Sequence, residues 1–258
     1  MRFLAVTDLH YSDKAFGEDG RRHALSAGKL RSALREHAAG CGFVMNLGDT
    51  ADQAEGSRAQ ETLLEEVREA LRGTGLPYYS IIGNHDTSIP KPLFYPHLYM
   101  PDRFYTFVCG AYLCVVLDAC LNDPAQPLPP QEIVWDNCWL DPMQLQWLDS
   151  VLQNAERDVL IFSHVPFMLS DPGQTDPHLI RNRMEGIRRF TDSGKVRAVF
   201  SGHYHAGCTA VYGGIPYITF GAMVPGEENT HAVVDVTDDG VFVTGFGRQP
   251  SVAFPRRN

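Results

Sequence analysis

The sequence predicts an α/β protein, because short apolar runs alternate along the chain with longer amphipathic segments. Several apolar runs end next to an acid, an amide or a histidine, as strands do when they carry a site at their carboxyl ends. The 258 residues are 44% hydrophobic and 21% charged, a globular composition that excludes collagen-like and disordered classes. We expect a single domain over residues 1–258, since neither a linker nor an internal repeat interrupts the pattern.

The first half of the chain alternates expected strands with expected helices. The strands cover residues 2–7, 41–47 and 78–82, and the helices cover 21–39 and 58–71. Residues 104–108 and 112–117 flank Cys109-Gly110 and predict a hairpin.

The second half begins with a Pro-rich segment over 121–140. Asp141 then precedes Pro142 and Gln144, which is typical of a capped helix start, and we expect that helix to reach about residue 155. Strands over 159–162 and 196–200 flank an expected helix over 178–191. Three further strands, over 215–220, 232–236 and 241–246, complete the chain.

Charge and cysteine content narrow the partners and the compartment. The 22 basic and 31 acidic residues give a net charge of −9, so few Lys and Arg are available for phosphate backbones, which argues against nucleic acid as a partner. The six cysteines show no CxxC spacing and read as free thiols in a reducing compartment. The apolar run after Arg2 is too short for a signal peptide, and no stretch has the ~20 apolar residues of a membrane span. We therefore expect a cytoplasmic protein with no membrane partner.

Five strand ends carry the residues that point to chemistry. They are Asp8-Leu9-His10, Gly48-Asp49, Gly83-Asn84-His85-Asp86, His164, and Gly202-His203-Tyr204-His205. Near a strand end, residues at i and i+2 point the same way, so the D-x-H and H-x-H pairs can each converge on one point. The glycines allow tight turns and keep the neighbouring side chains unobstructed.

The number and type of these residues predict a metal centre. Seven side chains can bind a metal: Asp8, His10, Asp49, Asn84, His164, His203 and His205. Seven ligands favour two ions over one, since two ions ~3.5–4 Å apart can share a carboxylate. Oxygen and nitrogen donors without cysteine suit manganese, iron or zinc.

In this order, the five blocks closely resemble the calcineurin-like metallophosphoesterase superfamily, over residues 2–212. The resemblance implies two packed mixed β-sheets flanked by helices, a four-layer αββα sandwich. It implies that Asp49 bridges two ions. One ion would be held with Asp8, His10 and His205, and the other with Asn84, His164 and His203. His85 matches a catalytic histidine that contacts the phosphoryl oxygens or protonates the leaving group, and Asp52 matches a carboxylate that orients it.

The expected cofactors are therefore two divalent ions, with manganese favoured over iron and zinc. A water that bridges two cations loses a proton near neutral pH, and the resulting hydroxide attacks phosphorus in line. His85 would stabilise or protonate the leaving oxygen as a general acid.

Departures from the better-known branches narrow the substrate. Protein Ser/Thr phosphatases of the superfamily have Arg-Gly after the acid at position 52, whereas this chain has Gln53-Ala54, and purple acid phosphatases have a tyrosine at position 52. The chain looks most like small phosphodiesterases and the manganese-dependent ADP-ribose/CDP-alcohol diphosphatases, through residues 76–79, 144–148 and 245–250. We expect a small phosphodiester or nucleoside-diphosphate substrate.

Two alternatives stay open. One is a phosphodiesterase for cyclic nucleotides or glycerophosphodiesters, which shares the same core. The other is a non-catalytic protein-binding scaffold, which the presence of all seven ligand positions and His85 disfavours.

For most of the other polar residues near these motifs we expect a structural or surface role. Asp86 is expected to be structural, and Tyr204, between two ligands, to point away from the metals. Five histidines are expected to be structural or on the surface, with His97 and His231 as the first of them to line a site: His23, His37, His97, His178 and His231. Candidates to stack on a base are Phe94, Tyr95, Tyr99 and Trp135; Arg181 and Arg183 are expected on a solvated helix face, with a distal phosphate as the alternative.

Overall fold

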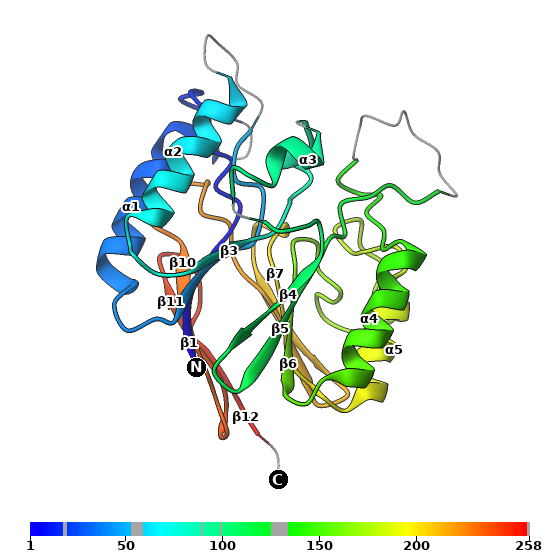
Figure 1. The fold of residues 1–258 in the computed structure, drawn as a ribbon. Coiled ribbons are helices and arrows are strands. Elements are labelled where there is room, and N and C mark those ends of the chain that lie inside the picture. Colours follow the sequence, from blue (N-terminus) through cyan, green and yellow to red (C-terminus); the bar gives the residue numbers. More distant parts are fainter. Residues whose placement is uncertain (18–19, 53–58, 89, 99, 125–133, 257–258) are drawn as a thin grey trace.

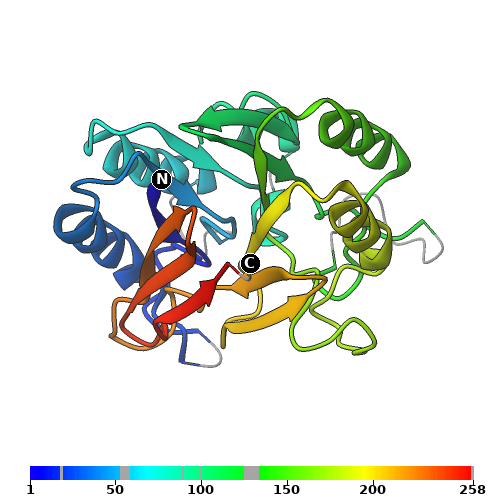
Figure 2. The same cartoon turned by 90° about the horizontal axis from the view of Figure 1, so that it is seen from below.

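In the computed structural model, two six-stranded mixed β-sheets pack face to face, and helices cover the outer face of each (Figures 1 and 2). The structure describes residues 1–17, 20–52, 59–88, 90–98, 100–124 and 134–256. Helices α1 (Ser26–His37) and α2 (Gln60–Arg72) pack together beside one sheet, and α4 (Pro142–Asn154) and α5 (Arg183–Ser193) pack together beside the other. This arrangement confirms the predicted αββα sandwich.

The first sheet has the order β12-β11-β10-β1-β2-β3. Its parallel half consists of β1 (Arg2–Val6), β2 (Phe43–Asn46) and β3 (Tyr78–Ser80). Its antiparallel half consists of β10 (His231–Thr237), β11 (Gly240–Phe246) and β12 (Val252–Pro255). Because parallel strands end at the same edge, the loops after β1, β2 and β3 lie side by side.

The second sheet has the order β4-β5-β6-β7-β9-β8. Four strands run parallel: β5 (Tyr112–Leu117), β6 (Asp158–Ser163), β7 (Val196–Ser201) and β9 (Ile215–Thr219). The edge strands β4 (Tyr105–Cys109) and β8 (Cys208–Tyr212) run antiparallel to their neighbours. The loops after β6 and β7 therefore also meet at one edge.

Aromatic rings fill the space between the sheets. Phe3 on β1 stacks on Phe43 on β2 at 4.9 Å and meets Phe200 on β7 edge-on at 5.4 Å. Phe162 on β6 stacks on Phe200 at 5.2 Å, and all four side chains are buried. Such pairs contribute about 0.5–1.5 kcal/mol each beyond their buried area. They join the strands of the two sheets whose ends carry the candidate ligands.

The structure differs from the sequence-based expectation in several elements. Strands β8 and β12 were not predicted, because both are edge strands whose side chains are largely exposed. The helix expected from residue 178 begins only at Arg183, because the amide of Ile180 donates to the carbonyl of Pro166 instead of continuing a helix. Two short helices were also not predicted: His85–Ser88 and α3 (Lys91–Phe94). Within the helix expected over 21–39, His23–Leu25 forms a separate 3-10 turn before α1 begins at Ser26.

None of the helices in the described ranges has the length and apolar character that a bilayer span requires.

Candidate metal centre

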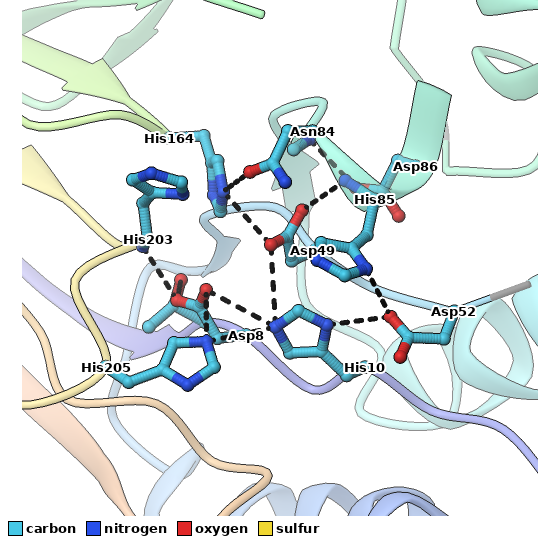
Figure 3. A network of polar contacts seen from close by, with 12 residues as sticks. Asp8, His10, Asp49, Asp52, Asn84, His85, Asp86, His164, His203 and His205 are labelled. Atoms are coloured by element: carbon cyan, nitrogen blue, oxygen red, sulfur yellow. Dashed lines mark hydrogen bonds and ion pairs between the residues drawn. The ribbon is translucent and has the colours of Figure 1, made fainter. Parts of the chain in front are cut away.

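The five polar strand ends meet at one edge of the two sheets (Figure 3). The β1 loop carries Asp8 and His10, the β2 loop carries Asp49, the β3 loop carries Asn84, and the loops after β6 and β7 carry the other three histidines. Backbone hydrogen bonds join the first two loops, from Asp8 N to Gly48 O at 3.0 Å and from His10 N to Asp49 O at 2.8 Å. The structure thus brings all seven expected ligands together; that they bind metal stays a prediction.

The first cluster consists of Asp8, His10 and His205, whose ligand atoms lie within 4.8 Å of one another. The Nε2 atoms of His10 and His205 are 3.1 Å apart, and Asp8 Oδ1 lies 3.7 Å from the first and 3.5 Å from the second. Two ring nitrogens and a carboxylate oxygen this close to one another could hold one metal ion.

The second cluster consists of Asp49, His164 and His203. His164 Nε2 lies 3.3 Å from Asp49 Oδ2 and 3.3 Å from Asn84 Oδ1. Asp49 Oδ2 also lies 3.5 Å from His10 Nε2, which belongs to the first cluster. One carboxylate oxygen is therefore shared between the two clusters, as a bridging ligand would be.

Hydrogen bonds on the far side of two rings fix which nitrogen faces the cluster. His10 Nδ1 donates to Asp52 Oδ1 at 2.7 Å, and His164 Nδ1 donates to Leu47 O at 2.8 Å. With Nδ1 occupied, each ring presents Nε2 to the ligand cluster. Asp52 Oδ1 also lies 2.9 Å from His85 Nδ1, so Asp52 orients both His10 and His85; sequence reasoning expected only the second contact.

Two of the expected ligands each have a buried atom with no hydrogen-bond partner among the described residues: Asp8 Oδ1 and His203 Nε2. Leaving a buried carboxylate oxygen and an imidazole nitrogen without a hydrogen bond is costly. A divalent cation in each cluster would satisfy them, and the donors are all oxygen or nitrogen. The residues present therefore fit two divalent ions.

In the metal-free site, the pKa shifts favour ionised carboxylates, two protonated histidines and one neutral histidine. Burial opposes ionisation of Asp8, but hydrogen bonds from His10 and His205 hold its pKa well below the usual range. Burial also opposes charge on His10 and His164, yet nearby carboxylates, Asp49 foremost, raise both pKa values to about 10. Burial and then the charge of His164 lower the pKa of His203 to about 3.

The backbone at four of the ligands is in the left-handed region. Among the described residues, the non-glycine positions with positive φ are Asp8 (52°), His10 (43°), Asp49 (51°) and His203 (66°). Each such residue costs of order 1–3 kcal/mol and persists only where its surroundings impose it. All four are expected metal ligands, so the strain is concentrated at the site.

Neighbouring side chains approach the backbone at two strand ends so closely that only glycine fits there. A Cβ atom on Gly83 would lie 2.1 Å from Asp49 Oδ1, and one on Gly202 would lie 2.0 Å from Thr7 Oγ1 and 2.7 Å from Asp8 Oδ2. The expectation that these glycines leave room for the neighbouring carboxylates is confirmed.

Asp86 holds the loops after β2 and β3 together, as its expected structural role requires. Its carboxylate accepts from the backbone amides of Thr50 and Gly83, both at 2.9 Å, and of Ala51 at 3.3 Å. Burial, followed by the charge of Asp49, raises the pKa of Asp86 to about 7.

A cleft of about 690 Å³ opens over the clusters. His178, which was expected to be structural or on the surface, and Tyr204, which was expected to point away from the metals, both line this cleft. Alternation along a strand does not apply to Tyr204, because β7 ends at Ser201 and the positive φ of His203 begins a turn. The ring of His178 lies 5.1 Å from Tyr204 and 4.8 Å from Trp135. Arg21 and Arg248, which sequence reasoning did not single out, line the cleft as well.

Several other candidates lie elsewhere. His97 faces Glu65 at 3.7 Å, and His231 faces His37 at 3.0 Å, so neither lines the cleft. Phe94 is fully buried, Tyr95 packs against the core, and Tyr99 lies outside the described residues. Arg181 and Arg183 donate to carbonyls of neighbouring loops rather than reaching the cleft. Of the candidates for stacking on a base, Trp135 lines the cleft.

Comparison with known proteins agrees with this geometry. Residues 1–207 match the family described as calcineurin-like phosphoesterase, which confirms the resemblance seen in the sequence. The chain is 30% identical over 212 residues to "Serine/threonine-protein phosphatase CPPED1" of Danio rerio, covering 77% of this chain and 66% of that protein. It is 28% identical over 306 aligned residues to "Manganese-dependent ADP-ribose/CDP-alcohol diphosphatase" of Arabidopsis thaliana, covering 98% and 96%.

Among solved structures, a dimetal phosphatase from Danio rerio superposes with a TM-score of 0.83 at 22% identity, covering 100% of this chain and 99% of that one. The chain spans less than two thirds of the CPPED1 proteins that it matches, 66% in Danio rerio and 58% in Bos taurus.

Replacement of Gly83 by alanine should destabilise the metal-free protein. The added Cβ would overlap Asp49, and overpacking of this kind costs about 1–3 kcal/mol. The matched control is Gly28→Ala in α1, where nothing lies within 4 Å of the added atom and alanine favours the helix by up to about 1 kcal/mol. Urea denaturation measures both. Equal stability of the two variants would contradict the close approach of Gly83 and Asp49.

Manganese binding should release protons at pH 8. With pKa values near 10, the metal-free His10 and His164 carry protons there, and each must lose one to present Nε2 to an ion. We expect about two protons released per chain, and apparent affinity that rises with pH up to about 10. Calorimetric titration in two buffers of different ionisation enthalpy measures the release. An observed enthalpy that is the same in both buffers would show that no proton is released, and would contradict the raised pKa values of His10 and His164.

Proposed function

We propose that this chain, which belongs to the calcineurin-like phosphoesterase family, is a metal-dependent phosphoesterase. It hydrolyses phosphodiester or pyrophosphate bonds in small nucleotide-type substrates, with two metal ions. The observation that carries the proposal is the pair of His/Asp clusters that share Asp49 Oδ2. ADP-ribose and CDP-alcohols represent the substrate class.

We assign one ion to Asp8, His10, Asp49 and His205, and the other to Asp49, Asn84, His164 and His203. Two divalent ions so placed would supply Lewis acidity toward the phosphoryl oxygens and an acidified water as nucleophile. Manganese is the favoured ion, because the donors are oxygen and nitrogen and the Arabidopsis thaliana relative is named manganese-dependent.

His85 is the proposed proton donor to the leaving oxygen. Its backbone amide donates to Asp49 Oδ1 at 2.9 Å, and its Nδ1 lies 2.9 Å from Asp52 Oδ1, so the ring is fixed from two directions. Burial opposes ionisation of Asp52, but hydrogen bonds from His10 and His85 hold its pKa well below the usual range. With Nδ1 committed to an ionised carboxylate, the His85 side chain, 36% exposed, offers Nε2 to a leaving group in the cleft.

Aromatic side chains on one wall of the cleft support a nucleotide-type substrate. Trp135 is 43% exposed, and its ring lies 4.8 Å from His178 and 6.3 Å from His203. A flat, partly exposed aromatic surface beside the second cluster is suited to stacking on a base. The similarity to the diphosphatase over nearly the full length of both chains supports the same class.

Protein phosphatase activity is the second candidate, because several relatives bear that name. The match covers less than two thirds of those proteins, and Gln53-Ala54 stands where protein phosphatases of the superfamily have Arg-Gly. Phosphodiesterase activity on cyclic nucleotides or glycerophosphodiesters is separated from the main proposal by substrate preference alone.

The manganese-loaded protein should cleave ADP-ribose and CDP-choline in preference to cyclic AMP, glycerophosphocholine, a phosphomonoester and a phosphoserine peptide. Product release by liquid chromatography gives the preference. Asp49→Asn should lose metal and activity together, because it removes the shared charge. His85→Ala should keep two ions but lose about 10²–10⁴-fold in kcat, the usual contribution of a general acid.

Preference for the peptide would replace the proposed substrate class with protein substrates. Full activity of Asp49→Asn would contradict the shared-carboxylate centre.

Trp135→Ala should raise KM for ADP-ribose roughly tenfold, since stacking on a base is worth about 1–3 kcal/mol. Trp135→Phe retains a ring and should stay within about threefold of the wild type. Steady-state kinetics of the three proteins, checked for equal metal content, decide the point. A KM for Trp135→Ala within twofold of the wild-type value would remove Trp135 from the substrate site.

A further inference from the structure

Two arginines, Arg21 and Arg248, line the cleft beside the metal clusters. The Nε atom of Arg21 is buried and has no hydrogen-bond partner among the described residues. Arg248 donates through Nη2 to the carbonyl of Ala222 at 3.2 Å. In contrast, the neighbouring Arg22 pairs with Glu227 at 3.1 Å and does not line the cleft. The two cleft arginines thus keep guanidinium donors for an anion.

A single segment, residues 222–225, fixes both arginines to the side of the cleft that carries His205. Ala222 donates to the carbonyl of His205 at 3.1 Å, and Arg248 donates to the carbonyl of the same Ala222. Arg21 pairs with Pro225 in an isolated antiparallel bridge. Val224 donates to the carbonyl of Asp8 at 3.0 Å, so the segment that holds the arginines also touches the first cluster.

Lys29 supports this segment from behind. Its Nζ donates to the carbonyls of Met223 and Gly226, both at 2.8 Å, and its side chain is buried. Burial, followed by the charge of Arg248, lowers the pKa of Lys29 to about 8. Three basic side chains therefore gather around one loop in a chain whose net charge is −9.

We propose that Arg21 and Arg248 form a phosphate subsite, which binds the phosphate adjacent to the one placed at the metal ions. This inference rests on the proposed function and narrows its substrate class to diphosphates. The aromatic wall of Trp135 and His178 lies next to His203. The segment that holds the arginines is hydrogen-bonded to His205, so both walls border the metal clusters in the same cleft. A nucleoside diphosphate derivative fits that order, with its base at the aromatic wall and its second phosphate at the arginines.

The subsite selects ligands that carry a second, negatively charged phosphate. Guanidinium groups bind phosphate oxygens through paired, charge-assisted hydrogen bonds, which are stronger than neutral ones. A diester with one phosphate presents nothing to the arginines once that phosphate is at the metal ions. Loss of one arginine should therefore weaken diphosphate binding by about 10- to 100-fold and leave a monophosphate nearly unaffected.

The test compares α,β-methylene-ADP, which resists hydrolysis between its phosphates, with AMP on the manganese-loaded protein. Calorimetry gives Kd for wild type, Arg21→Gln, Arg248→Gln and the matched control Arg22→Gln. We expect each of the first two variants to weaken α,β-methylene-ADP about 10- to 100-fold and AMP less than about threefold, and the control to change neither. Arg21→Lys and Arg248→Lys, which keep the charge, should bind better than the glutamine variants even if these fold poorly.

The possible results separate the subsite from the proposed function. Equal weakening of AMP and α,β-methylene-ADP, or an equal effect of Arg22→Gln, would mean a general field of positive charge and would overturn the subsite. Selective weakening in a protein that hydrolyses neither ADP-ribose nor CDP-choline would keep the subsite and overturn the proposed activity. Wild-type affinities in both cleft variants, in a protein that hydrolyses ADP-ribose, would overturn the subsite alone.

Discussion

The position of the Asp49 carboxylate is the constraint on which the rest of the site depends. Its Oδ2 lies 3.3 Å from His164 Nε2 and 3.5 Å from His10 Nε2, so one oxygen serves histidines from both sheets. Its Oδ1 accepts the amide of His85 and leaves no room for a side chain at position 83. Asp86 fixes the loop on either side by accepting the amides of Thr50 and Gly83. A small shift of this carboxylate would disturb both clusters and the proposed acid.

Packing between the two sheets holds the Asp49 carboxylate in that position. The rings of Phe3, Phe43, Phe162 and Phe200 join β1 and β2 to β6 and β7. These four strands present six of the seven candidate ligands, Asp49 among them. Strained backbone at Asp8, His10, Asp49 and His203 is tolerable because these strands cannot move apart without opening a buried aromatic cluster. Aromatic packing in the core thus offsets the free energy that the strained backbone costs at the edge of the sheets.

Features formed by residues close together in the chain could be predicted from the sequence, whereas features formed by contacts between distant segments could not. The strand ends and the ligand pairs were predictable, because Asp8 and His10, or His203 and His205, are close in the chain and bordered by apolar runs and glycines. The aromatic wall of the cleft and the pair of arginines were not predictable in this way. Tyr204 faces the cleft through a turn that alternation cannot reveal, and His178, Arg21 and Arg248 are brought there by contacts between loops far apart in sequence. Edge strands β8 and β12, with mostly exposed side chains, lack the apolar runs that identify the central strands.

The most direct test of the two-cluster account is an anomalous difference map from a crystal of the manganese-loaded protein. The account predicts two peaks on either side of Asp49, one contacted by His10 and His205 and the other by His164 and His203. The ligands of the first ion would include Asp8 Oδ1, which has no hydrogen-bond partner among the described residues. A single peak, or peaks that Asp49 does not contact, would contradict the shared-carboxylate centre from which the function is argued.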